Sequence, residues 1–301
     1  MRLVIAGASG FIGTPLCSQL LQAGHVLTLL TRSAPRNATT SQKKWLHWTP
    51  GTPGDWESAL EGADGVINLA GEPIAAKRWT HIQKRKIQMS RIGTTNSLVD
   101  AIEKAKHRPA FLLNASAVGY YGPRGDETVT EATESGNDFL ASVCREWEEA
   151  AKKAEPLGVR VIRLRTGIVL GRGGGALAKM VLPFKFFAGG PLGSGMQWMP
   201  WIHIDDEIGL MLYLLENEAK GAFNATAPNP VKMDEFCRTL GKVMGRPSWL
   251  GAPAFALQLA LGEMADMLLT GQRAIPAAAH ELGYKFRYPI LFEALQACMP
   301  L

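Results

Sequence analysis

The stretch Gly7-Ala8-Ser9-Gly10-Phe11-Ile12-Gly13 lies between a short apolar run, Arg2–Ala6, and a segment with helical spacing over residues 11–23. The run has the length and composition of a buried strand, and a GxxGxxG motif between a strand and a helix is typical of a dinucleotide-binding turn. Glycines let the backbone approach a pyrophosphate, whose charge is favoured at a helix N-terminus. We therefore predict cofactor contacts from Gly7, Ser9, Gly10, Phe11, Ile12 and Gly13.

The next apolar segment, Val26–Thr31, completes a βαβ unit, and the residues at its end indicate which dinucleotide fits. An acidic residue at this point binds a ribose 2′-hydroxyl, whereas an arginine accommodates a 2′-phosphate. Thr31 and Arg32 occupy it, and no Asp or Glu occurs from residue 25 to 54. We predict NADP(H) as the cofactor, bound through these two residues. The alternative is a basic surface loop that contains Arg32, Arg36, Lys43 and Lys44.

Strand and helix patterns continue to alternate over the first 170 residues. Further strands are expected at 65–70, 110–116 and 159–170, and helices at 82–104 and 138–155. Parallel neighbours need crossover connections, so this alternation predicts an α/β fold with a doubly wound parallel Rossmann sheet.

Beyond residue 171 the pattern changes, because glycines interrupt short apolar pieces and loops are expected up to about residue 201. A helix at 205–216, a strand at 222–225, a helix at 233–244 and a helical C-terminal region are expected next. We predict a Rossmann domain over 1–170 and a smaller substrate lobe over 171–301. Some segments of this lobe should return to the Rossmann domain, with a ligand cleft between the two parts.

The composition is that of a globular protein, with 301 residues, 47% of them hydrophobic and 20% charged. The net charge of +5 suits an anionic ligand but does not indicate nucleic-acid binding, and the densest basic stretch, from Arg78 to Arg91, is expected on a solvated helix face. No secretory signal or apolar run of membrane-spanning length is visible. The four scattered cysteines indicate reduced thiols, no metal site and a cytoplasmic location.

With these motifs in place, the chain resembles the extended short-chain dehydrogenase/reductases. It is most similar to the atypical branch whose members are labelled "epimerase family protein", and also cell-division inhibitor-like. The resemblance rests on the order of the glycine motif and of segments 68–71, 116–122, 163–171, 201–206 and 223–228. It implies further cofactor contacts from Leu69, Ala70 and Gly71, and a homodimer that pairs through the helices at 82–104 and 138–155.

Typical members of this family carry a Tyr-x-x-x-Lys pair on the helix that follows the serine-bearing strand, where the lysine lowers the pKa of the tyrosine. In this chain the tyrosine position holds Phe139 or Leu140, and the lysine position holds Val143 or Cys144. The pair is therefore missing, and the usual catalytic tyrosine is not carried over.

Ser116 matches the family serine that hydrogen-bonds the reacting oxygen, and Tyr120 or Tyr121 offers a phenol from the following loop. A tyrosine without a lysine should keep a pKa of about 10 and act as an acid, which suits reduction of a carbonyl. We expect an NADP(H)-dependent oxidoreductase or epimerase-like enzyme acting on a small carbonyl or sugar-derived substrate. The alternative is a non-catalytic dinucleotide-binding regulatory protein, linked to cell division.

Several other polar residues have both a functional and a structural interpretation. Cys144 is either a reactive thiol or a packing residue, and His203 faces the cleft or is buried. Asp205 or Asp206 is placed to cap the next helix. Arg163 and Arg165 share one strand face, from which one of them can meet a substrate phosphate.

Overall fold

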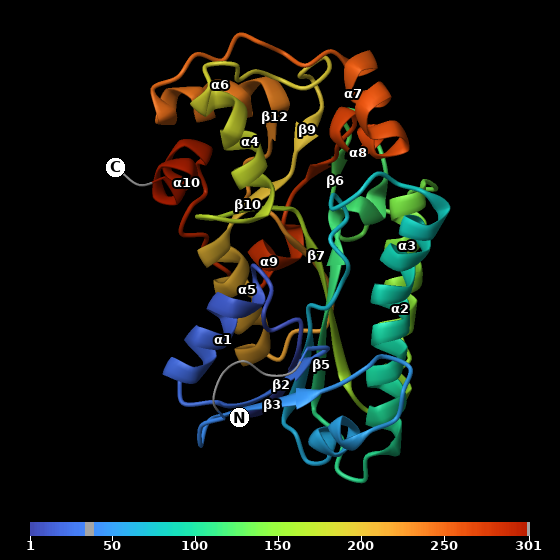
Figure 1. Cartoon of the computed structure of the whole chain (residues 1–301). Coiled ribbons are helices and arrows are strands. Elements are labelled where there is room, and N and C mark those ends of the chain that lie inside the picture. The colour runs from blue at the N-terminus through green and yellow to red at the C-terminus, as the bar shows by residue number, and fades with distance from the viewer. Residues whose placement is uncertain (34–38, 300–301) are drawn as a thin grey trace.

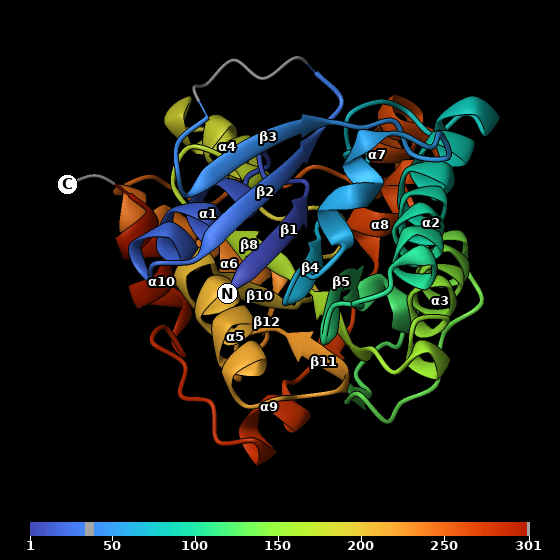
Figure 2. The same cartoon turned by 90° about the horizontal axis from the view of Figure 1, so that it is seen from below.

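A computed structural model describes residues 1–33 and 39–299 of the chain. Its centre is a seven-stranded parallel sheet in the order β11-β7-β5-β4-β1-β2-β3 (Figure 2). The strands are β1 (Arg2–Ala6), β2 (Val26–Thr31), β3 (Lys43–His47), β4 (Gly65–Asn68), β5 (Phe111–Ala117), β7 (Arg160–Thr166) and β11 (Gly221–Ala225). The predicted α/β fold with a doubly wound parallel sheet is confirmed.

Helices cover both faces of this sheet (Figures 1 and 2). One face carries α1 (Gly13–Gln22) and α5 (Ile204–Glu216), and the other carries α2 (His81–Lys104) and α3 (Phe139–Lys152). Side chains alternate along a strand, so Leu3 and Ile5 of β1 pack on the α1 side, whereas Val4 and Ala6 pack on the α2 side. Burial on both faces explains why Leu3, Val4, Ile5 and Ala6 form a continuous apolar run in β1.

A smaller lobe lies beyond the carboxyl ends of the strands (Figure 1). Its core packs around Trp201, Phe184 and Phe236. Its helices are α4 (Gly175–Lys185), α6 (Met233–Met244), α7 (Ala254–Leu261), α8 (Asp266–Leu269) and α10 (Leu291–Cys298). Short strand pairs complete it, namely β8 (Ile168–Leu170) with β10 (Trp201–His203), β9 (Trp198–Met199) with β12 (Val231–Lys232), and β13 (Arg273–Ala274) with β6 (Thr128–Val129).

The remaining helices are short. They are α9 (Ala277–Glu281) and the 3-10 turns η1 (Asp55–Leu60), η2 (Val118–Tyr121), η3 (Glu155–Leu157) and η4 (Gly262–Ala265). Within residues 1–33 and 39–299, no helix has the length and apolar character that a membrane span requires.

The structure corrects four expectations about the elements. The first helix begins at Gly13 rather than at residue 11, and the edge strand β3 was not predicted, because its sequence is largely polar. The strand expected over 159–170 is interrupted at Gly167, where a side chain would clash with the carbonyl group of Pro200. The glycine-rich region after residue 171, expected as loops, contains the helix α4.

The chain returns to the main sheet after entering the lobe, because β11 pairs with β7 and α5 packs on the same face as α1. This topology brings residues from both halves of the sequence to the carboxyl edge of the sheet. The domain boundary at residue 170 stays a prediction.

Candidate functional site

Two glycines of the 7–13 turn are required by the packing of the protein itself. Gly7 has a positive φ of 84°, and a Cβ atom there would lie 2.6 Å from the carbonyl carbon of Leu69. A Cβ atom at Gly13 would clash with the carbonyl oxygen of Gly7. Only glycine allows this conformation and this close approach, so the turn after β1 packs directly on the loop after β4.

Gly10 differs from these two glycines because the space around it is open. It is exposed, as is Ser9, and a Cβ atom at Gly10 would meet only the Gly7 oxygen, at 3.2 Å. The backbone N–H groups of Phe11, Ile12 and Gly13 make no hydrogen bond to any residue that the structure describes, and no side chain caps α1. Unpartnered N–H groups at a helix N-terminus, beside an exposed glycine, are suited to hydrogen-bond an anionic group such as phosphate.

The side chains of Phe11 and Ile12 pack against other parts of the protein. Phe11 contacts the glycine run of the lobe, where Cβ atoms at Gly171 and Gly175 would lie 2.8 and 2.9 Å from its ring and one at Gly174 would overlap it. Ile12 packs against the core beneath α1. Any contact of Phe11 and Ile12 with a cofactor phosphate would therefore come from their backbone.

Thr31 and Arg32 lie beside this turn, because β2 pairs with β1 in a register that aligns Leu30 with Ala6. The Thr31 hydroxyl accepts a hydrogen bond from the N–H of Ser33 at 3.2 Å. Arg32 is exposed, and its guanidinium makes no hydrogen bond or ion pair with any residue within the described ranges. Arg36, which belongs to the alternative basic loop, lies outside the described residues.

The loop of Leu69, Ala70 and Gly71 is held in place by backbone and buried polar contacts. The Leu69 N–H donates to the Ala6 carbonyl at 2.9 Å, and the Ala70 N–H donates to the side chain of Asn68 at 3.2 Å. Asn68 is buried and donates to Asn114 at 2.7 Å. These contacts fix the loop against the 7–13 turn and leave Gly71 exposed at the edge of the sheet.

Ser116 takes part in a buried ionic network on the α3 side of the sheet. Its hydroxyl donates to Glu148 Oε1 at 2.8 Å, and Arg165 Nε donates to the same oxygen at 2.8 Å. Arg163 also contacts Glu148, at 3.3 Å. Both arginines are thus paired with an internal carboxylate rather than turned toward a substrate phosphate. No pattern in the sequence indicates this role for Glu148.

The two adjacent tyrosines have different environments. Tyr121 is fully buried, donates to Asn224 Oδ1 at 2.6 Å and accepts from Arg165 Nη1 at 2.9 Å, and burial raises its pKa to about 12. The expectation that Tyr121 brings a phenol into the cleft is wrong, because its hydroxyl is already hydrogen-bonded inside the core. Tyr120 is half-buried, with the Arg165 guanidinium 3.5 Å from its ring centre. Tyr120 lies in η2, directly after the carboxyl end of β5, and keeps some exposed surface.

Of the residues considered for the missing Tyr-x-x-x-Lys pair, Leu140 and Cys144 contact the segment after β5. A Cβ atom at Gly119 would lie 3.5 Å from the Cβ of Leu140 and 3.9 Å from the sulfur of Cys144. These two residues face the segment after β5, one helical turn apart on α3. Burial raises the pKa of the Cys144 thiol to about 12, which favours the packing interpretation over a reactive thiolate.

His203 has a structural role at the start of α5. It is 4% exposed, its Nδ1 accepts from the N–H of Asp205 at 3.2 Å, and burial lowers its pKa, which favours the neutral form needed to accept. The expectation that Asp205 or Asp206 caps this helix is wrong, since His203 does so. The Asp206 carboxylate instead accepts from the N–H groups of Arg287 and Tyr288 at 2.7 and 2.8 Å.

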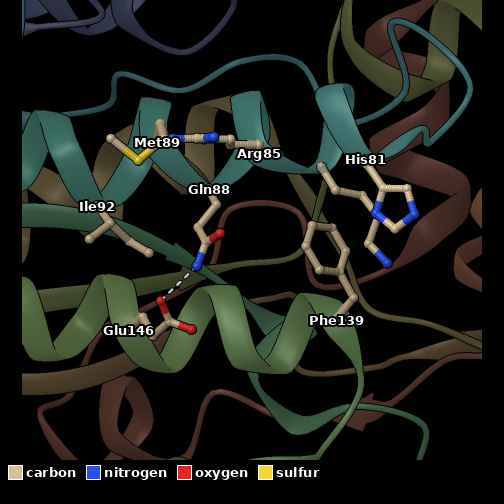
Figure 3. Close-up of a pocket in the computed structure, with 8 residues that line it drawn as sticks. His81, Arg85, Gln88, Met89, Ile92, Phe139 and Glu146 are labelled. Carbon is tan, nitrogen blue, oxygen red and sulfur yellow. Dashed lines mark hydrogen bonds between the residues drawn. The ribbon is translucent and has the colours of Figure 1, made fainter.

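A separate open groove of about 520 Å³ lies between α2 and α3 (Figure 3). Gln88 and Glu146 bridge the two helices across it with a hydrogen bond of 2.8 Å. The residues proposed from the sequence as cofactor contacts or catalytic groups do not line it. It lies on the two helices through which the family resemblance implies a homodimer, and that dimer stays a prediction.

Comparison with known proteins identifies two family models that match this chain. Residues 3–226 match the model of the NAD dependent epimerase/dehydratase family, and residues 252–298 match a domain of unknown function, DUF1731. The first match ends just after β11, the strand that returns to the main sheet.

Individual relatives match over nearly the whole chain. The chloroplastic epimerase family protein SDR39U1 homolog of Arabidopsis thaliana is 45% identical over 99% of this chain and 87% of its own length. The crystal structure of human epimerase family protein SDR39U1 with NADPH is 34% identical, with a TM-score of 0.87 over 99% of both chains. The nucleoside-diphosphate sugar epimerase from Corynebacterium glutamicum is also 34% identical, with a TM-score of 0.78 over 99% of this chain and 58% of its own.

Proposed function

Because the chain belongs to the NAD dependent epimerase/dehydratase family, we propose that it binds NADP(H) at the carboxyl edge of its sheet and uses it as an oxidoreductase or epimerase-like enzyme. The proposed substrate is a small carbonyl or sugar-derived compound. The Corynebacterium relative, a nucleoside-diphosphate sugar epimerase, supports the sugar-derived class.

The observation that carries the cofactor proposal is the group of unpartnered donors around Gly10. The N–H groups of Phe11, Ile12 and Gly13 would hold the pyrophosphate, while Arg32 would pair with the 2′-phosphate of the adenosine ribose. Arg32 is exposed at the end of β2 and has no acidic neighbour in the sequence that would favour a free 2′-hydroxyl. The human relative crystallised with NADPH supports the same choice.

In the proposed reaction the bound dinucleotide supplies the hydride, and the protein supplies the proton. The Tyr120 hydroxyl would donate its proton to the oxygen that becomes an alcohol, and water would reprotonate the phenol. Ser116 would act as a positioning residue, because its hydroxyl and Arg165 share Glu148, and the Arg165 guanidinium packs on Tyr120. With no lysine at the position of Cys144, proton donation is favoured over proton abstraction.

The cofactor proposal is tested by fluorescence titration of the full chain with NADPH and with NADH. Arg32→Ala should weaken NADPH binding about tenfold to a hundredfold, because a charged hydrogen bond to phosphate is lost, and should leave NADH binding unchanged. Lys44→Ala is the matched control, since Lys44 is an exposed cation on the neighbouring strand β3. Equal weakening by both variants would support the basic-loop alternative, and absence of binding to either nucleotide would contradict the proposal.

A second candidate, a dinucleotide-binding regulatory protein without catalysis, is favoured by Leu140 and Cys144 at the acid–base positions. The two candidates differ in turnover. Oxidation of NADPH with a panel of carbonyl compounds, slowed about a hundredfold or more by Tyr120→Phe, supports the enzyme. NADPH binding without turnover on any of them favours the regulatory protein.

A further inference from the structure

The helix α7 is apolar along its whole length and yet has no buried residue. Its sequence, AFALQLAL, contains one polar residue, Gln258. Phe255 and Leu259 lie one turn apart, and they are 72% and 79% exposed. A helix of this composition in a globular protein normally buries its apolar side chains in a core. Packing within the described part of the chain therefore does not explain the composition of α7.

More exposed apolar side chains lie at the C-terminal end of α4 and in the connection between α6 and α7. Phe186 and Phe187 follow α4 directly, and Trp249 and Leu250 belong to the connection. Trp249 joins the two segments, because its Nε1 donates to the Phe187 carbonyl at 3.0 Å. Figure 1 shows α7 and the connection at the end of the molecule opposite the N-terminus. The outer apolar surface consists of Phe186, Phe187, Trp249, Leu250, Phe255 and Leu259.

Phe187 lies in the outer apolar surface with an unfavourable backbone conformation. Its φ is 58°, in the left-handed region that bulky residues rarely adopt. The residue is exposed, so burial of its ring does not offset the strain. Strained residues cluster at ligand-binding and other functional sites, which favours a binding role for this surface.

The segments that carry the outer apolar surface contain cations and no acidic residue. No Asp or Glu occurs from residue 156 to 204 or from 236 to 262. Lys185 and Arg246 are exposed beside the aromatic side chains, and the Arg246 guanidinium lies 4.4 Å from the ring centre of Phe187. This end of the surface is therefore both apolar and positively charged.

The C-terminal end of α7 is positively charged as well. Arg78 lies against it, since a Cβ atom at Gly262 would be 2.8 Å from the Arg78 Nε. Glu263 is the first acidic residue after α7, and its carboxylate is paired with Lys84 at 2.6 Å. Cations thus lie at both ends of the exposed helix.

We propose that the outer apolar surface binds to the face of an anionic lipid bilayer. Phe, Trp and Leu side chains are suited to enter the boundary between headgroups and acyl chains, while flanking Lys and Arg residues attract anionic headgroups. A second copy of the chain is a poorer occupant, because pairing the surface with itself would bring like charges together. This proposal does not depend on NADP(H) binding.

The apolar part of the proposal is tested by sedimentation of the full chain with vesicles. Binding is expected to vesicles of phosphatidylcholine with phosphatidylglycerol, which is anionic, and much less to phosphatidylcholine alone. Phe255→Gln combined with Leu259→Gln should weaken binding about tenfold or more, because two apolar side chains no longer leave water. Met89→Gln is the matched control, since Met89 is an exposed apolar residue of α2 away from α7, and it should change nothing.

The electrostatic part is tested with the same vesicles. Lys185→Gln and Arg246→Gln should each weaken binding about fivefold, and added salt should weaken it further. Lys44→Gln, which removes an exposed cation from β3, should have no effect. Brominated lipids should quench the fluorescence of Trp249, and the quenching should be largely lost in Trp249→Phe.

Several outcomes would overturn the proposal. Equal binding to neutral and anionic vesicles would contradict the role of the cations, and absence of binding to both would contradict the proposal as a whole. Unchanged vesicle binding in the α7 double variant would mean that another surface meets the lipid. A dimer of the wild-type chain that this variant dissociates, without vesicle binding, would show that a second copy covers the surface instead.

Discussion

The ring of Phe11 lies against the Cα atom of Gly174, so closely that a methyl group added at Gly174 would overlap the ring. Phe11 belongs to the 7–13 turn, and Gly174 immediately precedes α4 in the smaller lobe. The lobe therefore packs against the 7–13 turn, and the glycines that follow residue 170 leave space for the ring of Phe11.

We predict that Gly174→Ala weakens NADPH binding and destabilises the protein by about 1–3 kcal/mol, the usual cost of overpacking. The backbone at Gly174 is extended, so alanine introduces no conformational strain and the effect should come from Phe11 alone. Phe11→Leu in the same chain should restore most of the loss, measured as a double-mutant cycle of denaturant unfolding and NADPH titration. Strictly additive effects of the two substitutions would contradict this explanation.

Tyr121→Phe should lower the free energy of unfolding by about 1–3 kcal/mol, because Asn224 loses its hydrogen-bond donor inside the core. The substitution should leave the pH dependence of any NADPH-linked turnover unchanged, since the Tyr121 hydroxyl has no exposed surface. Tyr120→Phe should show the reverse, a small change in stability and a large change in turnover. Stability curves and pH profiles of the two variants, measured side by side, check both statements.

Glu207 should make stability depend on pH. Burial raises its pKa from 4.5 to about 8 in the folded protein, where Thr166 donates to it at 2.8 Å and its other oxygen has no partner in the described residues. Between these two values the folded state binds more protons than the unfolded state, so its contribution to stability falls as pH rises from about 4.5 to 8.

Glu207→Gln removes this titration. The difference in unfolding free energy between variant and wild type should shift in favour of the variant across that pH range, by on the order of 3 kcal/mol. Taking the difference cancels the histidines and other groups common to both proteins. A difference that does not change between pH 5 and pH 8 would mean that the carboxyl group is not held neutral in the folded state.

The cysteines should be unreactive in the folded protein. All four are buried, and burial raises the pKa of Cys144 and Cys237 to about 12 and of Cys17 and Cys298 to about 11. A thiol-specific reagent at pH 8 should label none of them until denaturant is added, and then all four. Rapid labelling of Cys144 in the native protein would reinstate it as a reactive thiol.

Most of the main sheet could be predicted from the sequence, because the information for it is local. A few consecutive residues are enough to predict β1 and the glycines after it, and the same holds for the apolar strands β2 and β4. The strand β3 lacks this signal, since an edge strand with exposed polar residues resembles a loop. The helix α4 is not recognisable in the sequence because glycines, which usually indicate a loop, lie at its start. In the structure these glycines leave space for the ring of Phe11.

The candidate site was predictable only where backbone shape determines it. Gly7 and Gly13 were found from their spacing, whereas the choice between Tyr120 and Tyr121 depends on Asn224, which lies 103 residues further along the chain. Glu148 lies on a helix, where a charged residue is ordinarily solvated, and only the packing of α3 against β5 and β7 brings it to Ser116 and Arg165. No pattern within a single segment contains that information.

The late position of β11 in the chain also affects how the protein must be made. Until residue 225 has left the ribosome, β7 has an unpaired edge, and Tyr121 lacks the Asn224 oxygen that accepts its hydroxyl proton. A fragment that stops near residue 170 would keep this open edge permanently and invite pairing between copies. Nascent chains therefore expose this edge until β11 has been made, and the lobe helices α6, α7, α8 and α10 are synthesised only after the sheet is complete.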